Sequence, residues 1–176
     1  NELASRIDDS KAKLLVTASC GYEPGRTVHY KPLVNKALEL ANHKPNKCII
    51  LQREKDKAEL DSKIDITWED AHKDAKPSGC EEMNANDYAY ILYTSGTTGL
   101  PKGIVRDIGG HIVALKWTMK NIYNIEQDDV WWSASDIGWI VGHSYIVYAP
   151  LFYGCTTVLF EGKPVGTPDA GVFWRV

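Results

Sequence analysis

The chain has 176 residues, of which 44% are hydrophobic and 24% charged, and its formal net charge is −3 at pH 7. This composition is typical of one globular domain or of a part of a larger one, and it gives no general electrostatic reason to bind nucleic acid or an anionic membrane. No apolar stretch approaches the roughly 18 residues of a membrane span, and the four widely spaced cysteines form no CxxC pair, so we expect an intracellular protein with reduced thiols.

Strand and helix signals alternate in residues 1–51. The apolar run 14–18 predicts a buried strand followed by a loop, and Cys48–Leu51 predicts a second strand. Between them, apolar residues at helical spacing follow Pro32 (Leu33, Ala37, Leu40 and Ala41) until residues 42–45 end the pattern. This order is typical of parallel pairing in an α/β fold. The first residues resemble a helix already under way and the last ones the start of an element, so we expect a part of a larger protein.

Residues 53–87 differ in composition from the rest of the chain. They contain 11 acidic and 6 basic side chains and few large apolar ones. We interpret them as a polar acidic surface excursion with a short helix near Trp68–Ala75, or as a mobile connector. The charges are expected to form a solvated face rather than a partner site.

The second half of the chain shows clearer secondary-structure signals. Residues 88–93 predict a strand that leads into a Gly/Thr-rich loop, and residues 104–106 predict a short return strand. Strands are also expected at 130–132 and 156–160, and a buried apolar helix at 141–153 with Gly154 after its end. The helix that follows Gly110 presents one apolar face, made of Ile112, Leu115, Met119 and Ile122.

The loop after residue 93 has the composition of a phosphate-binding loop. Its glycines allow backbone N–H groups to converge on an anion, four hydroxyl side chains add donors, and Lys102 adds a positive charge. A Walker A loop would need glycine at Pro101 and Ser or Thr at Gly103, and the glycine spacing does not fit a Rossmann fingerprint either. A polar hairpin turn without a ligand remains the alternative.

The run Tyr93–Gly103 resembles the signature loop of the acyl-adenylate-forming, or AMP-binding, enzymes. The resemblance implies that the chain is part of their large N-terminal α/β domain, with parallel-rich sheets and flanking helices. It also implies that the loop holds the β- and γ-phosphates of ATP. The residues that this assigns to ATP are Thr94, Ser95, Gly96, Thr97, Thr98, Gly99 and Lys102.

A second run, Trp131–Tyr145 with Phe160–Pro164, is similar to the acetyl- and propionyl-CoA synthetases. In that branch the residue matching Trp139 lies beside the acyl group, whereas Trp131 and Trp132 are expected to be packed aromatics. Val141 falls where acetyl-CoA synthetases carry threonine and propionyl-CoA synthetases carry valine. We therefore favour propionate over acetate, although one extra methylene is worth only about 0.8 kcal/mol.

The loop Glu23-Pro24-Gly25-Arg26 matches the part of this branch that meets the adenosine end of CoA. Arg26 corresponds to an arginine that contacts the 3′-phosphate. Glu23 departs from a second arginine in bacterial acetyl-CoA synthetases, and its charge would repel phosphate, so CoA binding is expected to be weaker or differently arranged. An ordinary surface turn is the alternative.

Other polar residues near the second run carry no separate site. Gly142-His143-Ser144 lacks the closing glycine of a hydrolase nucleophile elbow, so His143 is expected to be a buried, hydrogen-bonded histidine at the start of a helix. Asp136 is expected to cap the turn before Trp139. The remaining histidines show no metal-ligand spacing, and we expect no metal ligand within the chain.

The resemblance implies a two-step ligase that uses ATP, CoA and Mg²⁺ to activate a short-chain carboxylate. The adenine-binding motif, the magnesium ligand and the C-terminal domain are expected outside these 176 residues, so the chain alone is predicted to be inactive. The alternatives are an inert truncated phosphate-binding fragment and a GTPase-like module, which the two Walker A mismatches disfavour. The compartment is expected to be the mitochondrial matrix or the cytoplasm.

Overall fold

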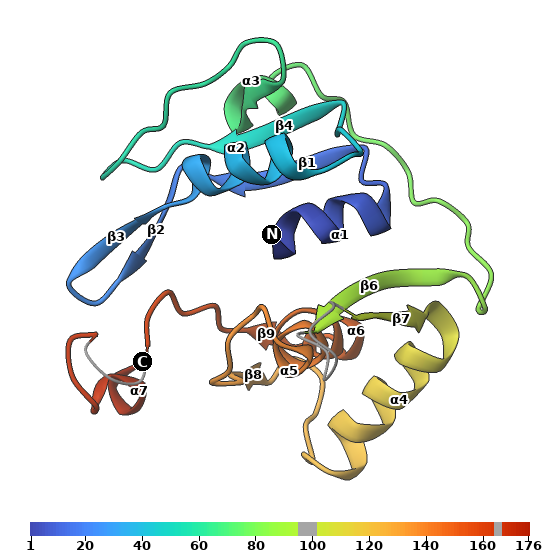
Figure 1. Ribbon diagram of the computed structural model, residues 1–176. Helices are drawn as coiled ribbons and strands as arrows, with labels where there is room; N and C mark the ends of the chain where they lie inside the picture. Colours follow the sequence, from blue (N-terminus) through green and yellow to red (C-terminus); the bar gives the residue numbers. More distant parts are fainter. Residues whose placement is uncertain (95–101, 164–166) are drawn as a thin grey trace. The chain divides into compact units, whose positions relative to one another are not determined.

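A computed structural model describes residues 1–94, 102–163 and 167–176 (Figure 1). The described chain forms two compact units, one made of Asn1–Gly79 with Lys102 and the other of Cys80–Thr94 with Gly103–Val176. Each unit combines helices with short sheets, and parallel strand pairs occur in both. The α/β class predicted from the sequence is therefore confirmed.

The first unit is built on a parallel sheet of three strands. Strand β1 (Leu14–Ala18) pairs with β4 (Lys47–Leu51), and β4 pairs with β5 (Asp65–Thr67), so the order is β1-β4-β5. Helix α2 (Tyr30–Leu40) connects β1 and β4 as the predicted strand–helix–strand unit requires. Helices α1 (Glu2–Ser10) and α3 (Trp68–His72) complete the unit, and α3 is the short helix predicted in the acidic segment.

The core of the first unit lies between the helices and one face of this sheet. Val34 of α2 packs with Cys48 and Ile50 of β4, and Ala4 and Ile7 of α1 pack with the end of α2. The other face of β1 is open, since Leu14 is 54% and Val16 is 58% exposed. The strand lies where it was predicted, but only one of its two faces is buried.

The buried face of α2 also differs from the predicted one. Leu33 and Leu40 are exposed, while Lys31 is buried to 3% exposure together with Val34. Lys31 can be buried because its Nζ lies 2.7 Å from Oδ2 of Asp65, which is itself buried. Asp65 belongs to the segment interpreted as a surface excursion, and strand β5 was not predicted there. Three residues are too short a run to give a periodic signal.

A β-hairpin replaces the loop that was expected after β1. Strands β2 (Cys20–Glu23) and β3 (Arg26–His29) pair antiparallel, with Glu23 opposite Arg26. Pro24 and Gly25 form the two-residue turn, and Gly25 has a φ of 77°. Proline followed by a residue with positive φ is the pattern of a type II turn, for which glycine is preferred.

The second unit begins with the strands that flank the predicted phosphate loop. Strands β6 (Tyr88–Thr94) and β7 (Lys102–Asp107) pair in a two-stranded sheet, and their arrows point in opposite directions in Figure 1. Helix α4 (Ile108–Asn121) follows directly. Short parallel strands β8 (Val130–Trp131) and β9 (Thr156–Thr157) form a further pair, and α7 (Val172–Arg175) lies near the end of the chain. Strand β9 ends earlier than predicted because β8 offers only two residues for pairing.

Helix α4 supplies much of the core of the second unit. Leu115 and Met119 are buried as predicted and pack with Ala149 and Cys155. Ile122, which was assigned to the same apolar face, is 62% exposed because it lies at the C-terminal cap, beyond the last helical turn. His111 takes a buried place on this helix instead.

The apolar helix predicted at 141–153 is a composite. It consists of α5 (Ile140–Gly142), a π-helical stretch η1 (His143–Tyr148) and α6 (Ala149–Tyr153), and Gly154 ends it with a φ of 85°. In a π-helical stretch each N–H donates to the carbonyl five positions earlier, as the Ala149 N–H does to Ser144, so Pro150 has no N–H to donate to Tyr145. The Trp131 indole N–H donates to the Tyr145 carbonyl over 2.6 Å, and the Thr157 hydroxyl donates to the Ile146 carbonyl over 2.7 Å. The chain thus compensates for the proline with a side chain from β8.

Candidate functional site

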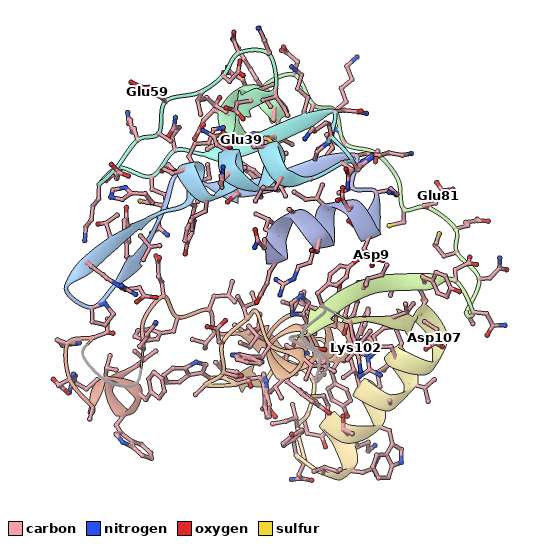
Figure 2. The ribbon with its side chains drawn as sticks, viewed as in Figure 1. Asp9, Glu39, Glu59, Glu81, Lys102 and Asp107 are labelled. Carbon is pink, nitrogen blue, oxygen red and sulfur yellow. The ribbon has the colours of Figure 1, made fainter. Side chains whose placement is uncertain are left out.

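The two strands around the predicted phosphate loop hold its ends. Thr94 is the last residue of β6 and Lys102 the first of β7, and Figure 2 shows Lys102 and Asp107 at opposite ends of β7. Lys102 is exposed, so its ammonium is accessible to an anion. The predicted phosphate ligands Ser95, Gly96, Thr97, Thr98 and Gly99 lie outside the described residues.

Gly103 lets β7 approach β6 closely. A Cβ at this position would lie 2.9 Å from Cγ2 of Ile91 and 3.3 Å from Cε1 of Tyr93. Both contacts are shorter than ordinary van der Waals separations, so a larger residue would push the strands apart. Gly103 stands where a Walker A loop would have Ser or Thr, and here it allows close packing next to Lys102.

A tight turn places Trp139 at the start of the composite helix. The Oδ1 of Asp136 accepts a hydrogen bond from Gly138 N–H (2.8 Å), and its carbonyl accepts one from Trp139 N–H (3.1 Å). Trp139 is the N-terminal cap residue of α5. The predicted capping role of Asp136 is thus confirmed.

Both residues predicted for the acyl pocket are accessible to a ligand. Trp139 is 69% and Val141 is 46% exposed, and only one residue separates them in the chain. Ile137, on the other side of the turn, is also exposed. Three exposed apolar side chains thus lie within five positions of the chain at this turn, and the acyl-pocket role of Trp139 and Val141 stays a prediction.

His143, in the helical stretch that follows, forms hydrogen bonds to the same turn. Its backbone N–H donates to the Trp139 carbonyl (3.0 Å), and its Nδ1 lies 3.1 Å from the same oxygen. The ring is half-buried rather than fully buried, and it lies 5.6 Å, centroid to centroid, from Tyr90. His143 is therefore hydrogen-bonded and starts a helical stretch as predicted, but burial is only partial.

An aromatic cluster around Tyr90 was not predicted. The Tyr90 ring stacks on Tyr148 with centroids 5.2 Å apart, and its hydroxyl lies 3.3 Å from Nε2 of His111. Burial lowers the pKa of His111, and the nearby Arg106 charge lowers it further, so this histidine is neutral near pH 7. The cluster joins residues from β6, α4 and η1, and such long-range contacts leave no local signal in a sequence.

The predicted CoA loop is the tip of the β2–β3 hairpin. Glu23 does not stand apart from Arg26, because its Oε2 accepts hydrogen bonds from Nε (3.3 Å) and Nη2 (3.0 Å) of that arginine. The Arg26 side chain is 71% exposed. Exposed ion pairs contribute only about 0.2–1 kcal/mol, so a phosphate could replace Glu23 as the partner at little cost. Glu23 would then compete with phosphate for Arg26, and the weaker or differently arranged CoA binding expected from Glu23 stays a prediction.

Metal-binding and membrane-spanning features were sought in the described ranges 1–94, 102–163 and 167–176. No group of three or more His, Cys, Asp or Glu residues in them could hold a metal ion. None of the helices in these ranges is long and apolar enough to cross a membrane. All four cysteines are free thiols, and three of them are buried.

Comparisons with known proteins concern the chain as a whole. The model of the AMP-binding enzyme family matches residues 1–176. An uncharacterized protein of Pseudomonas aeruginosa is 55% identical over 99% of this chain and 28% of its own length. The acyl-CoA synthetase short-chain family member 3, mitochondrial, of Rattus norvegicus is 54% identical over 99% of this chain and 26% of its own length.

A solved structure shows the same fold. The acetoacetyl-CoA synthetase from Streptomyces lividans matches 98% of this chain with a TM-score of 0.82, at 23% identity and over 26% of its own length. The chain thus spans about a quarter of the length of the proteins it matches. Because the family model covers every residue of the sequence, the chain belongs to the AMP-binding enzyme family.

Proposed function

We propose that this chain is the part of a short-chain acyl-CoA synthetase that binds the ATP phosphates. The observation that carries the proposal is the run Tyr93–Gly103, whose two ends lie in the paired strands β6 and β7 and which includes the exposed Lys102. In the first step a carboxylate oxygen attacks the α-phosphorus of ATP, and pyrophosphate leaves. In the second step the CoA thiol, losing its proton, attacks the acyl carbon, and AMP leaves.

The phosphate loop would act through position and charge. The hydroxyls of Thr94, Ser95, Thr97 and Thr98 and the backbone N–H groups of Gly96 and Gly99 would donate to oxygens of the β- and γ-phosphates. Lys102 would neutralise part of the charge that grows on the departing pyrophosphate. Donors that are in place when the bond to the α-phosphorus breaks lower the barrier, because they stabilise the growing charge without rearranging.

Magnesium would reach this site with ATP rather than through this chain. As the resemblance to the family implies, we expect the protein ligand for the ion, and the groups that bind adenine and ribose, outside these 176 residues.

We propose propionate as the preferred carboxylate, with acetate second. Trp139 and Val141 would form opposite parts of the acyl site, and the apolar Val141 side chain suits one more methylene than acetate has. The discrimination available from a single methylene is about 10- to 200-fold. The compartment, mitochondrial matrix or cytoplasm, is part of this proposal and follows the mitochondrial relative.

Carboxylate-dependent ATP–pyrophosphate exchange in the full-length protein tests the proposal, with acetate, propionate and butyrate compared in parallel. The fastest exchange with propionate would support both the chemistry and the role of Val141. The fastest exchange with acetate would keep the chemistry and remove the substrate assignment. If no carboxylate supports exchange, the enzyme assignment fails, and an inert phosphate-binding fragment becomes the better description.

A further inference from the structure

The carbonyl group of Trp139 accepts two hydrogen bonds from one residue. The backbone N–H of His143 donates to it over 3.0 Å, and the ring atom Nδ1 of His143 lies 3.1 Å from the same oxygen. A carbonyl oxygen can only accept, so Nδ1 carries the proton in this contact. Both lone pairs of the oxygen are then in use, and the orientation of the peptide group after Trp139 is fixed.

The backbone, rather than side-chain packing, determines where the Trp139 indole lies. The residue is 69% exposed, so most of its surface touches none of the described residues. It is the cap residue of α5, with an extended backbone (φ −90°, ψ 163°). The Asp136 carbonyl holds its N–H over 3.1 Å, and His143 holds its carbonyl. A change at either end of this residue would therefore displace the indole.

The ring of His143 is held in turn by aromatic neighbours. It lies 5.6 Å from the Tyr90 ring, centroid to centroid, and Tyr148 stacks on the same ring at 5.2 Å. The Tyr90 hydroxyl lies 3.3 Å from Nε2 of His111, which fixes the tyrosine at its other end. The half-buried imidazole of His143 is therefore restrained next to the Trp139 carbonyl, unlike a ring on an open helix surface.

The π-helical stretch η1 brings His143 and Tyr148 to the same tyrosine ring. In a π-helix each N–H bonds to the carbonyl five residues earlier, so residues five positions apart lie on one side. In an α-helix, with about 3.6 residues per turn, two such residues would point in clearly different directions. The contact of His143 with Tyr90 thus depends on this local geometry. Short π-helical stretches are frequent at functional sites.

Tyr90 also belongs to the strand that leads into the predicted phosphate loop. It lies in β6, four residues before Thr94, and alternate residues of a strand share one face. The contacts therefore run from the Trp139 carbonyl through the His143 ring to Tyr90. They join the two runs of the sequence that carry the predicted acyl and phosphate sites.

We propose that His143 is a positioning residue for the carboxylate substrate, because its Nδ1–H holds the Trp139 carbonyl while the Tyr90 ring holds His143. This inference rests on the proposed function, in which Trp139 lies beside the acyl group. His143 acts through Trp139 and not by contact with the substrate. Loss of the hydrogen bond would let the turn at Trp139 shift, so the carboxylate would bind less tightly. Binding of the ATP phosphates by the loop would not change.

The KM values of carboxylate-dependent ATP–pyrophosphate exchange in the full-length protein test this role. His143→Phe keeps an aromatic ring next to Tyr90 and removes the donor, so the KM for propionate should rise about fivefold, as expected for one hydrogen bond. The KM for ATP should not change. His143→Asn keeps an N–H donor near the position of Nδ1 and should restore most of the KM for propionate. A merely structural defect would lower the rate alone, because KM does not depend on the amount of active enzyme.

His72 of helix α3 provides a matched control. Its Nδ1 contacts the carbonyl of Trp68, four positions earlier, so it repeats the pattern of His143 and Trp139 at an exposed residue of the first unit. His72→Phe should leave both KM values unchanged. Tyr90→Leu removes the ring that holds His143 and should raise the KM for propionate. Tyr90→Phe keeps that ring and should raise it less.

Any one of the following results would overturn the inference. They are an unchanged KM for propionate in His143→Phe, an equal rise in the KM for ATP, a loss of rate alone, no recovery in His143→Asn, the same rise in His72→Phe, or equal rises in the two Tyr90 variants. Absence of exchange by the unmodified protein with every carboxylate would overturn the proposed function, and this inference with it. Normal exchange that His143→Phe leaves unaffected would overturn the inference alone.

Discussion

Gly142 lies directly beneath the turn that carries Trp139. A Cβ at Gly142 would lie 2.2 Å from the Asp136 carbonyl oxygen and 2.5 Å from the Ile137 Cα. These are backbone atoms of the turn itself, so they cannot move aside as the end of a flexible side chain could. A single hydrogen atom in place of a methyl group therefore permits the close approach of α5 to the turn.

The Gly142→Ala variant should be destabilised by about 1–3 kcal/mol, the usual cost of overpacking. In the full-length protein this corresponds to a lower thermal midpoint. Gly79→Ala is the matched control, because a Cβ there would meet no atom within 4 Å. Equal midpoints for the two variants would show that the turn can move without cost.

At the scale of elements, the composite helix depends on a partner from another part of the chain. The Thr157 hydroxyl donates to the Ile146 carbonyl over 2.7 Å. The Trp131 indole N–H donates to the neighbouring Tyr145 carbonyl over 2.6 Å. Side chains of β8 and β9 thus form hydrogen bonds to carbonyl groups of the π-helical stretch.

Replacing Thr157 by Val keeps the side-chain shape and removes the donor, so it should cost about 0.5–1.5 kcal/mol of unfolding free energy. Thr156→Val, at an exposed neighbouring position, should cost much less. Both losses are measured by denaturant unfolding. An equal loss in the two variants would refute the stabilising role of the Thr157 hydroxyl.

Most elements could be predicted from the sequence because their signals are local. The strand–helix–strand unit, β6 and β7 follow from apolar runs and their flanking turn residues. Strand β5 and the hairpin could not be predicted, because three- and four-residue strands show too little periodicity and depend on neighbours for pairing. The π-helical stretch was missed for the same reason, since its carbonyls are satisfied by β8 and β9.

The candidate site was likewise only partly predictable from the sequence. The phosphate loop and the turn at Trp139 have contiguous motifs, so their residues could be named from the sequence. The contact of the Arg53 guanidinium with the Tyr22 ring joins residues more than 30 positions apart in the chain, and so does the ion pair of Lys31 with Asp65. Such contacts exist only after folding, and the charged residues involved looked like part of a solvated surface.

At the scale of the whole molecule, the chain spans about a quarter of the length of its relatives. Acyl transfer to CoA needs ATP, its metal ion, a carboxylate and a thiol held in one arrangement. The 176-residue chain alone should therefore form no acyl-AMP, whereas the full-length protein should. Detection of acyl-AMP with the isolated chain, by separation of labelled adenylate, would contradict this expectation.

The edge position and the exposed apolar face of β1 predict that the isolated chain aggregates. In the described residues β1 pairs only with β4, which leaves it at the edge of the sheet with Leu14 and Val16 exposed. An edge strand with free backbone groups and an apolar surface is a template for pairing with other chains. Recombinant production of these 176 residues should consequently give inclusion bodies or soluble aggregates unless a fusion partner shields that edge.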